Sequence, residues 1–239
     1  MKLEADRGGD GPRLLILLHG LGATREVWRP MLAANRWQGR WIAPDLRGHG
    51  ASAHASSYTL AEHAADVAAL VDGAGDIVLL GHSMGGAVAL ALASGQYGIA
   101  PSKVFGLGIK VAWNGDELAG MQKMAASQPR IFETRDEAVA RYLKVSGLHG
   151  IASTTDYGVK QTDAGWRLAF DPATASIGPP PMTQLMEEAR CPIRLARGAN
   201  DAMVTQAQLA VYDADARDLP GGHNAMVENP GAVWDWIGA

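Results

Sequence analysis

A serine stands between glycines, in the pattern G-x-S-x-G, within Gly81-His82-Ser83-Met84-Gly85. The apolar run Ile77 to Leu80 precedes it, and an Ala- and Leu-rich helical pattern follows it. Glycines permit a sharp strand-to-helix turn that presents a serine hydroxyl at the top of a sheet. The N-terminus of the next helix favours negative charge at that point. We therefore predict that Ser83 is a nucleophile. The alternative is a glycine-rich strand-to-helix turn with the same sequence pattern and no catalytic role.

A second glycine-rich turn, His19-Gly20-Leu21-Gly22, follows the apolar run Leu14 to Leu18. Such a turn can place the Leu21 N–H opposite the Met84 N–H, so that both donate to the oxyanion of a tetrahedral intermediate. Loss of one such donor typically lowers the rate by roughly 10²–10³. We predict that the backbone N–H groups of Leu21 and Met84 form an oxyanion hole.

An attacking serine needs a base, and the base needs an acid that orients it. His223 lies between Gly222 and Asn224 on a predicted loop near the end of the sequence, and is the predicted base. His19, His49 and His82 are weaker candidates, because each belongs to a glycine turn with backbone requirements of its own.

The predicted acid is Asp201, which follows the strand pattern Ile193 to Arg197 through Gly198-Ala199-Asn200. The chain order Ser83, Asp201, His223 is the order that the motif predicts. Asp201 also suits the N-cap of a helix that begins at Ala202. Asp116 is the reserve candidate for the acid.

Buried strands and amphipathic helices alternate along the sequence and must position these residues. Continuous apolar runs predict strands at Leu14–Leu18, Trp41–Ala43, Ile77–Leu80, Val104–Ile109 and Ile193–Ala196. Helical patterns occupy Glu26–Ala34, Leu60–Val71 (with Thr59 as N-cap), Met84–Tyr97 and Pro230–Ile237. This alternation predicts an α/β fold whose mostly parallel central sheet has helices on both faces.

The alternation stops between residues 113 and 181. Helical patterns at Leu118–Ser127 and Arg135–Val145 are followed by the stiff segment Ile177-Gly178-Pro179-Pro180-Pro181. We predict a core domain of residues 1–112 and 182–239, and a mainly helical cap insertion of residues 113–181 over the edge of the sheet. A peripheral helical layer with no role at a site is the alternative.

These motifs together resemble those of the α/β-hydrolase superfamily, of the serine-nucleophile, carboxylesterase-like type with a small helical cap. The further landmarks are Trp28, one turn after Gly22, and the loop Asp45-Leu46-Arg47-Gly48-His49-Gly50. The resemblance implies that Asp45, Arg47 and His49 form a structural loop. Relatives that open epoxides or remove halide carry Asp as nucleophile, so Ser83 makes these activities unexpected.

The resemblance implies hydrolysis of a small-molecule carboxylic ester or lactone through an acyl-enzyme on Ser83, with no metal or organic cofactor. Two alternatives remain open. The same triad can serve a C–C bond hydrolase or a perhydrolase, and the fold can serve a ligand-binding protein of slow turnover.

Four residues are assigned to the substrate pocket: Trp28, Lys110, Trp113 and Tyr142. Trp28 suits the core equally well. Lys110 follows a strand at the edge where ligands bind in such sheets, so it can pair with a substrate carboxylate, or it is simply a solvated lysine. Further apolar residues of the cap suit either an acyl pocket or the cap's own core: Met121, Met124, Tyr142, Leu143, Leu148, Tyr157 and Trp166.

The composition restricts the partners. The 239 residues carry a net charge of −4 and no basic cluster, which disfavours nucleic acid, and the longest early apolar run is too short to cross a membrane. The single Cys191 excludes an internal disulfide. The beginning of the sequence lacks a signal-peptide pattern, so we expect a cytoplasmic protein that acts on a small molecule; the sequence assigns no oligomeric state.

Overall fold

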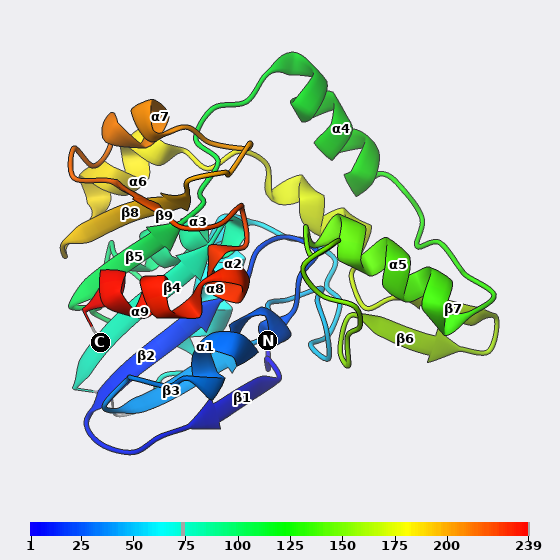
Figure 1. The fold of residues 1–239 in the computed structure, drawn as a ribbon, viewed down its shortest axis with the longest axis horizontal. Coiled ribbons are helices and arrows are strands. Elements are labelled where there is room, and N and C mark those ends of the chain that lie inside the picture. Colours follow the sequence, from blue (N-terminus) through cyan, green and yellow to red (C-terminus); the bar gives the residue numbers. More distant parts are fainter. Residues whose placement is uncertain (73–74, 239) are drawn as a thin grey trace.

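The computed structural model describes residues 1–72 and 75–238. Its described strands form a seven-stranded sheet in the order β1-β3-β2-β4-β5-β8-β9 (Figure 1). Every neighbouring pair is parallel except β1 and β3, which are antiparallel. The strands are β1 (Ala5–Gly8), β2 (Arg13–Leu18), β3 (Arg40–Pro44), β4 (Asp76–His82), β5 (Lys103–Leu107), β8 (Ile193–Gly198) and β9 (Arg217–Leu219).

Both faces of the sheet are buried, which explains why its strands are continuous apolar runs. Along β2 the side chains alternate between two cores: Leu15 and Leu17 belong to one, and Leu14, Ile16 and Leu18 to the other. All five side chains are 2% exposed or less. A strand covered on both sides has no polar face, so its sequence shows no alternation.

Helices cover each face of this sheet. One core contains residues of α2 (Leu60–Ala68), α3 (Met84–Leu92), α6 (Met182–Glu188) and α7 (Gln206–Ala210). The other contains residues of η1 (Arg25–Trp28), α1 (Arg29–Ala33), α8 (Ala225–Glu228) and α9 (Pro230–Ile237). The fold class predicted from the sequence is therefore confirmed. The predicted cap of α2 is also present, since Thr59 Oγ1 accepts the Glu62 N–H and Glu62 bonds back to Thr59 N–H.

The chain between β5 and α6 lies beyond the carboxyl ends of the central strands (Figure 1). It contains α4 (Gly115–Ala125), α5 (Arg135–Val145), the antiparallel hairpin of β6 (Val159–Thr162) and β7 (Gly165–Leu168), and the 3₁₀ helix η2 (Pro172–Ile177). The sequence did not predict the hairpin. Helix α4 begins three residues before the predicted start, because Asn114 and Glu117 form a capping box. Among the described residues, no helix combines the length and apolarity that a membrane span needs.

Candidate active site

Ser83 stands at a strained turn between β4 and α3. Its φ of 51° and ψ of −119° make it the one non-glycine residue with positive φ in the described part of the chain. A Cβ on Gly81 would lie 2.2 Å from the Gly85 carbonyl oxygen, and one on Gly85 would lie 2.3 Å from the Leu18 carbonyl oxygen. Both glycines are therefore required by close backbone packing, and the turn has the geometry that the motif predicts.

Asp201 and His223 are joined by a hydrogen bond of 2.8 Å between Oδ2 and Nδ1. The Asp201 side chain is fully buried, whereas that of His223 is 19% exposed. A carboxylate only accepts, so Nδ1 carries the proton and Nε2 of the neutral ring is left as the acceptor. Asp201 Oδ1 also accepts the Met203 N–H at 2.8 Å, so the same side chain closes its own turn.

Two neighbours restrict the position of His223. A Cβ on Gly108, whose φ is +62°, would lie 3.3 Å from His223 Nδ1 and 3.3 Å from Asp201 Oδ2. On another side, His82 Nε2 donates to the His223 carbonyl oxygen at 2.9 Å, and the two ring centres lie 4.5 Å apart. Burial, reinforced by the charge of a protonated His223, holds the pKa of His82 well below its usual range.

Leu21 and Met84, the predicted oxyanion donors, line the same cavity as Ser83 and His223. Met84 is the first residue of α3, so its N–H has no acceptor within the helix. Within the described residues, the Leu21 N–H has no backbone acceptor in its turn either. These two N–H groups therefore remain the candidates for the predicted oxyanion hole.

Hydrogen bonds to two buried histidines stabilise the turn that carries Leu21. His19 Nδ1 donates to the Gly20 carbonyl oxygen at 2.8 Å, and the Gly22 N–H donates to His49 Nε2 at 3.0 Å. Burial lowers the pKa of both rings. A neutral His49 is what the bond from Gly22 needs, since a protonated Nε2 could not accept it.

The sequence indicates Asp45, Arg47 and His49 as structural residues, and none of them lines the cavity. Asp45 accepts the backbone N–H groups of Arg25 and Ala51, each at 2.8 Å, and also pairs with the Arg25 guanidinium. The reserve acid Asp116 lies exposed on α4, and the structure pairs Asp201 with His223 instead.

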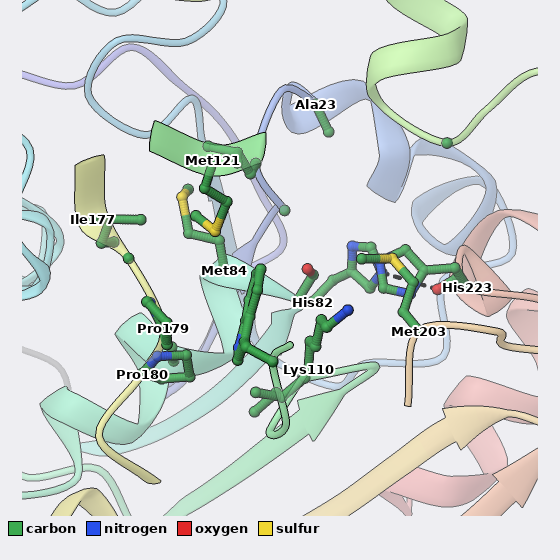
Figure 2. A pocket seen from close by; sticks show the side chains of 18 of the residues that line it. Ala23, His82, Met84, Lys110, Met121, Ile177, Pro179, Pro180, Met203 and His223 are labelled. Atoms are coloured by element: carbon green, nitrogen blue, oxygen red, sulfur yellow. Dashed lines mark hydrogen bonds between the residues drawn. The ribbon is translucent and has the colours of Figure 1, made fainter. Parts of the chain in front are cut away.

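A cavity of about 290 Å³ lies over Ser83, between the carboxyl end of the sheet and the insertion. Figure 2 shows Met84 and Met121 on one side of it, and Met203 with His223 on the other. Its remaining walls are mostly apolar, with Leu21, Leu60, Ile109, Trp113, Val145, Ile177 and the prolines 179–181. A mostly apolar cavity with a few polar groups suits an acyl chain whose reacting carbonyl meets the polar end.

Two of the four predicted pocket residues, Lys110 and Trp113, line this cavity. Trp28 and Tyr142 do not, so their assignment to the pocket was wrong. Trp28 is fully buried in the core beneath η1, and Tyr142 is 1% exposed. The Tyr142 hydroxyl lies 3.2 Å from Thr24 Oγ1, and burial raises its pKa to about 12. Both aromatic rings belong to one hydrophobic core.

Of the other apolar residues in the predicted cap, Met121 lines the cavity. Met124 lines a separate, smaller hollow, and Leu143 and Leu148 belong to the core. The sequence analysis missed Met203, Lys144 and the three prolines as lining residues. The prolines carried a signal, because the sequence already marked them as a stiff segment at the predicted end of the cap. In the described residues, no group of three or more His, Cys, Asp or Glu side chains could hold a metal ion.

The model of the Alpha/beta hydrolase family matches residues 15–236. Protein phosphatase methylesterase 1 of Bos taurus is 35% identical over 158 residues, which are 61% of this chain and 40% of that protein. Lipase LipV of Mycobacterium tuberculosis is 33% identical over 145 residues, 59% of this chain and 52% of the lipase. The match therefore spans about half of the length of these curated relatives.

Solved structures resemble the chain over nearly its full length. E-2-(acetamidomethylene)succinate hydrolase has a TM-score of 0.80 and 22% identity, covering 99% of this chain and 95% of that one. The thioesterase domain from the curacin biosynthetic pathway has a TM-score of 0.78 and 21% identity, covering 98% and 94%. Identities this low show a shared fold and leave the substrate open.

Proposed function

The chain belongs to the alpha/beta hydrolase family, and we propose that it is a serine hydrolase that cleaves a small-molecule carboxylic ester or lactone. One observation carries the proposal. The buried Asp201 holds His223 Nδ1 at 2.8 Å, and His223 lines one cavity with Ser83 at its strained turn. This arrangement supports a nucleophile, a base and an orienting acid acting on one substrate.

In the first half of the proposed reaction, Ser83 Oγ attacks the ester carbonyl carbon while its proton moves to His223 Nε2. The oxyanion that forms accepts from the N–H groups of Leu21 and Met84. When the intermediate collapses, the C–O bond to the alcohol breaks, and the alcohol leaves with the proton from His223. Asp201 balances the imidazolium charge throughout, and an acyl ester on Ser83 remains.

In the second half, water attacks the acyl carbonyl and gives a proton to His223 Nε2. Collapse breaks the bond between the acyl carbon and Ser83 Oγ, and His223 returns its proton to the serine. The net change is ester plus water to carboxylic acid plus alcohol, and no electrons are exchanged. A lactone follows the same steps, with the alcohol and the acid in one product.

The two curated relatives described above favour ester chemistry over other uses of the same triad. One is named a methylesterase and one a lipase, and both names describe cleavage of carboxylic esters. The apolar walls of the cavity suit the hydrocarbon part of such a substrate.

The proposal is tested by the hydrolysis of short-chain esters and lactones by wild type, Ser83→Ala and Ser56→Ala. Ser56 is an exposed serine outside the cavity, so its variant controls for the substitution itself. We expect wild type and Ser56→Ala to turn over at least one ester, and Ser83→Ala to lose roughly 10⁶ in kcat. Equal activity in Ser83→Ala would refute the acyl-enzyme.

Product analysis in the same assay separates the alternatives. A cleaved diketone would indicate a C–C bond hydrolase, and a peracid formed from added hydrogen peroxide would indicate a perhydrolase. Tight binding of an ester with negligible turnover would indicate a ligand-binding protein.

A further inference from the structure

The charged side chains that line the cavity are all of one sign. Lys110 and Lys144 line it, and none of the lining residues is Asp or Glu. This contrasts with the whole chain, whose net charge is −4. Low-dielectric walls with charges of one sign attract ligands of the opposite sign. The cavity is therefore suited to an anionic ligand, although its walls are mostly apolar.

Lys110 is the deeper of the two lysines, with 9% of its surface exposed. It lies two residues after Gly108, which packs against His223 and Asp201. In Figure 2 its side chain points into the cavity, between the Met84 and Met121 side and the His223 and Met203 side. Its ammonium also lies 4.9 Å from the centre of the Trp113 ring. A positive charge thus lines the same cavity as Ser83 and His223, the residues proposed to react.

A buried ammonium needs a counter-charge, and Glu117 supplies it in this structure. Glu117 comes from the first turn of α4, a helix with no buried residue. Its carboxylate is 37% exposed, and its second oxygen already accepts the Asn114 N–H at 2.9 Å. If the ion pair with Lys110 breaks, water can solvate the Glu117 carboxylate, and Glu117 can still cap its own helix.

We infer that the site selects esters that carry a carboxylate a few bonds from the ester group, and that this carboxylate replaces Glu117 as the partner of Lys110. The inference rests on the proposed function. A substrate that fills the cavity excludes water from the ammonium. The ion pair between Lys110 and the substrate carboxylate is therefore stronger once the substrate is bound. Lys144, which is exposed on α5, adds a second positive charge to the same cavity.

The test compares an anionic ester with a neutral one of the same length. The first pair is monoethyl glutarate, whose free carboxylate lies on the acyl side, and neutral ethyl pentanoate. The second pair is 4-acetoxyphenylacetate, whose carboxylate lies on the alcohol side, and neutral 4-ethylphenyl acetate. For each pair, kcat/KM is measured by acid release at constant pH. The pair with the larger preference for the anionic ester identifies which half of the substrate meets Lys110.

We expect wild type to prefer the anionic ester of one pair by about tenfold or more, and Lys110→Met to abolish that preference. Lys110→Arg keeps the charge and is expected to restore most of it. Glu117→Gln keeps a capping-box residue but removes the competing charge, so it is expected to lower KM for the anionic ester. Lys123→Met, at an exposed position on the same helix, controls for loss of a positive charge on α4.

The inference is overturned if Lys110→Met keeps the wild-type ratio, or if wild type prefers the neutral ester of both pairs. Thermal unfolding shows whether Lys110→Met is folded, and Lys110→Arg and Glu117→Gln decide the matter if it is not. Failure of the proposed function looks different, since wild type would then hydrolyse none of the four esters.

Discussion

The ring of His223 occupies the space that a side chain on Gly108 would need, at the carboxyl end of the sheet. Gly108 follows β5 with a φ of +62°, and a Cβ placed on it would lie 3.3 Å from His223 Nδ1. Because residue 108 has no side chain, the His223 ring can take the position in which it hydrogen-bonds to Asp201. A loop glycine that makes no polar contact with the ring thus sets the position of the proposed base.

Gly108→Ala is expected to lower kcat by about tenfold or more. Alanine in the left-handed region costs about 1–2 kcal/mol, and the added methyl group displaces a ring whose position the reaction depends on. Steady-state kinetics on any accepted ester measures the effect. Gly120→Ala is the control, because a Cβ there meets nothing within 4 Å and the helix interior favours alanine. Wild-type kcat in Gly108→Ala would contradict the role of this contact.

His82→Phe is expected to lower kcat more than it changes KM. The variant keeps a ring beside His223 but removes the N–H that donates to the His223 carbonyl at 2.9 Å, so the loop of the base loses an anchor. His82→Gln retains an N–H donor and is expected to retain more activity. The comparison is made by kcat and KM at fixed pH. If phenylalanine performs as well as histidine, the anchor has no catalytic importance.

Acid is expected to destabilise the fold through buried neutral histidines, of which His63 is the clearest. Burial lowers its pKa from 6.5 to about 4, and His63, a residue of α2, is fully buried. As the pH falls, His63 is protonated in the unfolded chain before it is protonated in the folded protein. The free energy of unfolding that is present above pH 6.5 is therefore lost progressively as the pH falls towards 4. From pH 7 to pH 5, His63 alone accounts for about 2 kcal/mol.

Urea unfolding of wild type and His63→Gln at pH 7 and pH 5 measures this loss. The variant does not titrate in this range, so its unfolding free energy should fall less between the two pH values. His149→Gln, at an exposed histidine, is the control and should behave as wild type. An identical pH dependence in wild type and His63→Gln would show that His63 is not buried in its neutral form.

The sheet could be predicted from the sequence because burial on both faces leaves an unmistakable pattern. The run Leu14 to Leu18 is apolar throughout, and it forms the centre of the sheet between β3 and β4. The hairpin of β6 and β7 could not be predicted in the same way. Its strands have four residues each and are mostly half-buried, so neither an apolar run nor a strict alternation marks them.

In the candidate site, too, some features could be predicted from the sequence and others could not. Ser83, Asp201 and His223 were predicted from glycine turns at strand ends, and the parallel sheet brings such ends to one edge. Trp28 and Tyr142 were placed in the pocket because of their aromatic type, but residue type does not reveal which side of a helix meets the cavity. The burial of Lys110 depends on Glu117 from α4, a tertiary contact that no local pattern could indicate.

The most direct test of the account is the intact mass of the protein after treatment with a fluorophosphonate. An activated serine displaces fluoride and keeps the phosphonyl group, so one adduct is expected on wild type and none on Ser83→Ala. His223→Ala is expected to label far more slowly, because the serine then lacks its base. Absence of an adduct on well-folded wild type, or an equal adduct on Ser83→Ala, would contradict the assignment of Ser83 as the nucleophile.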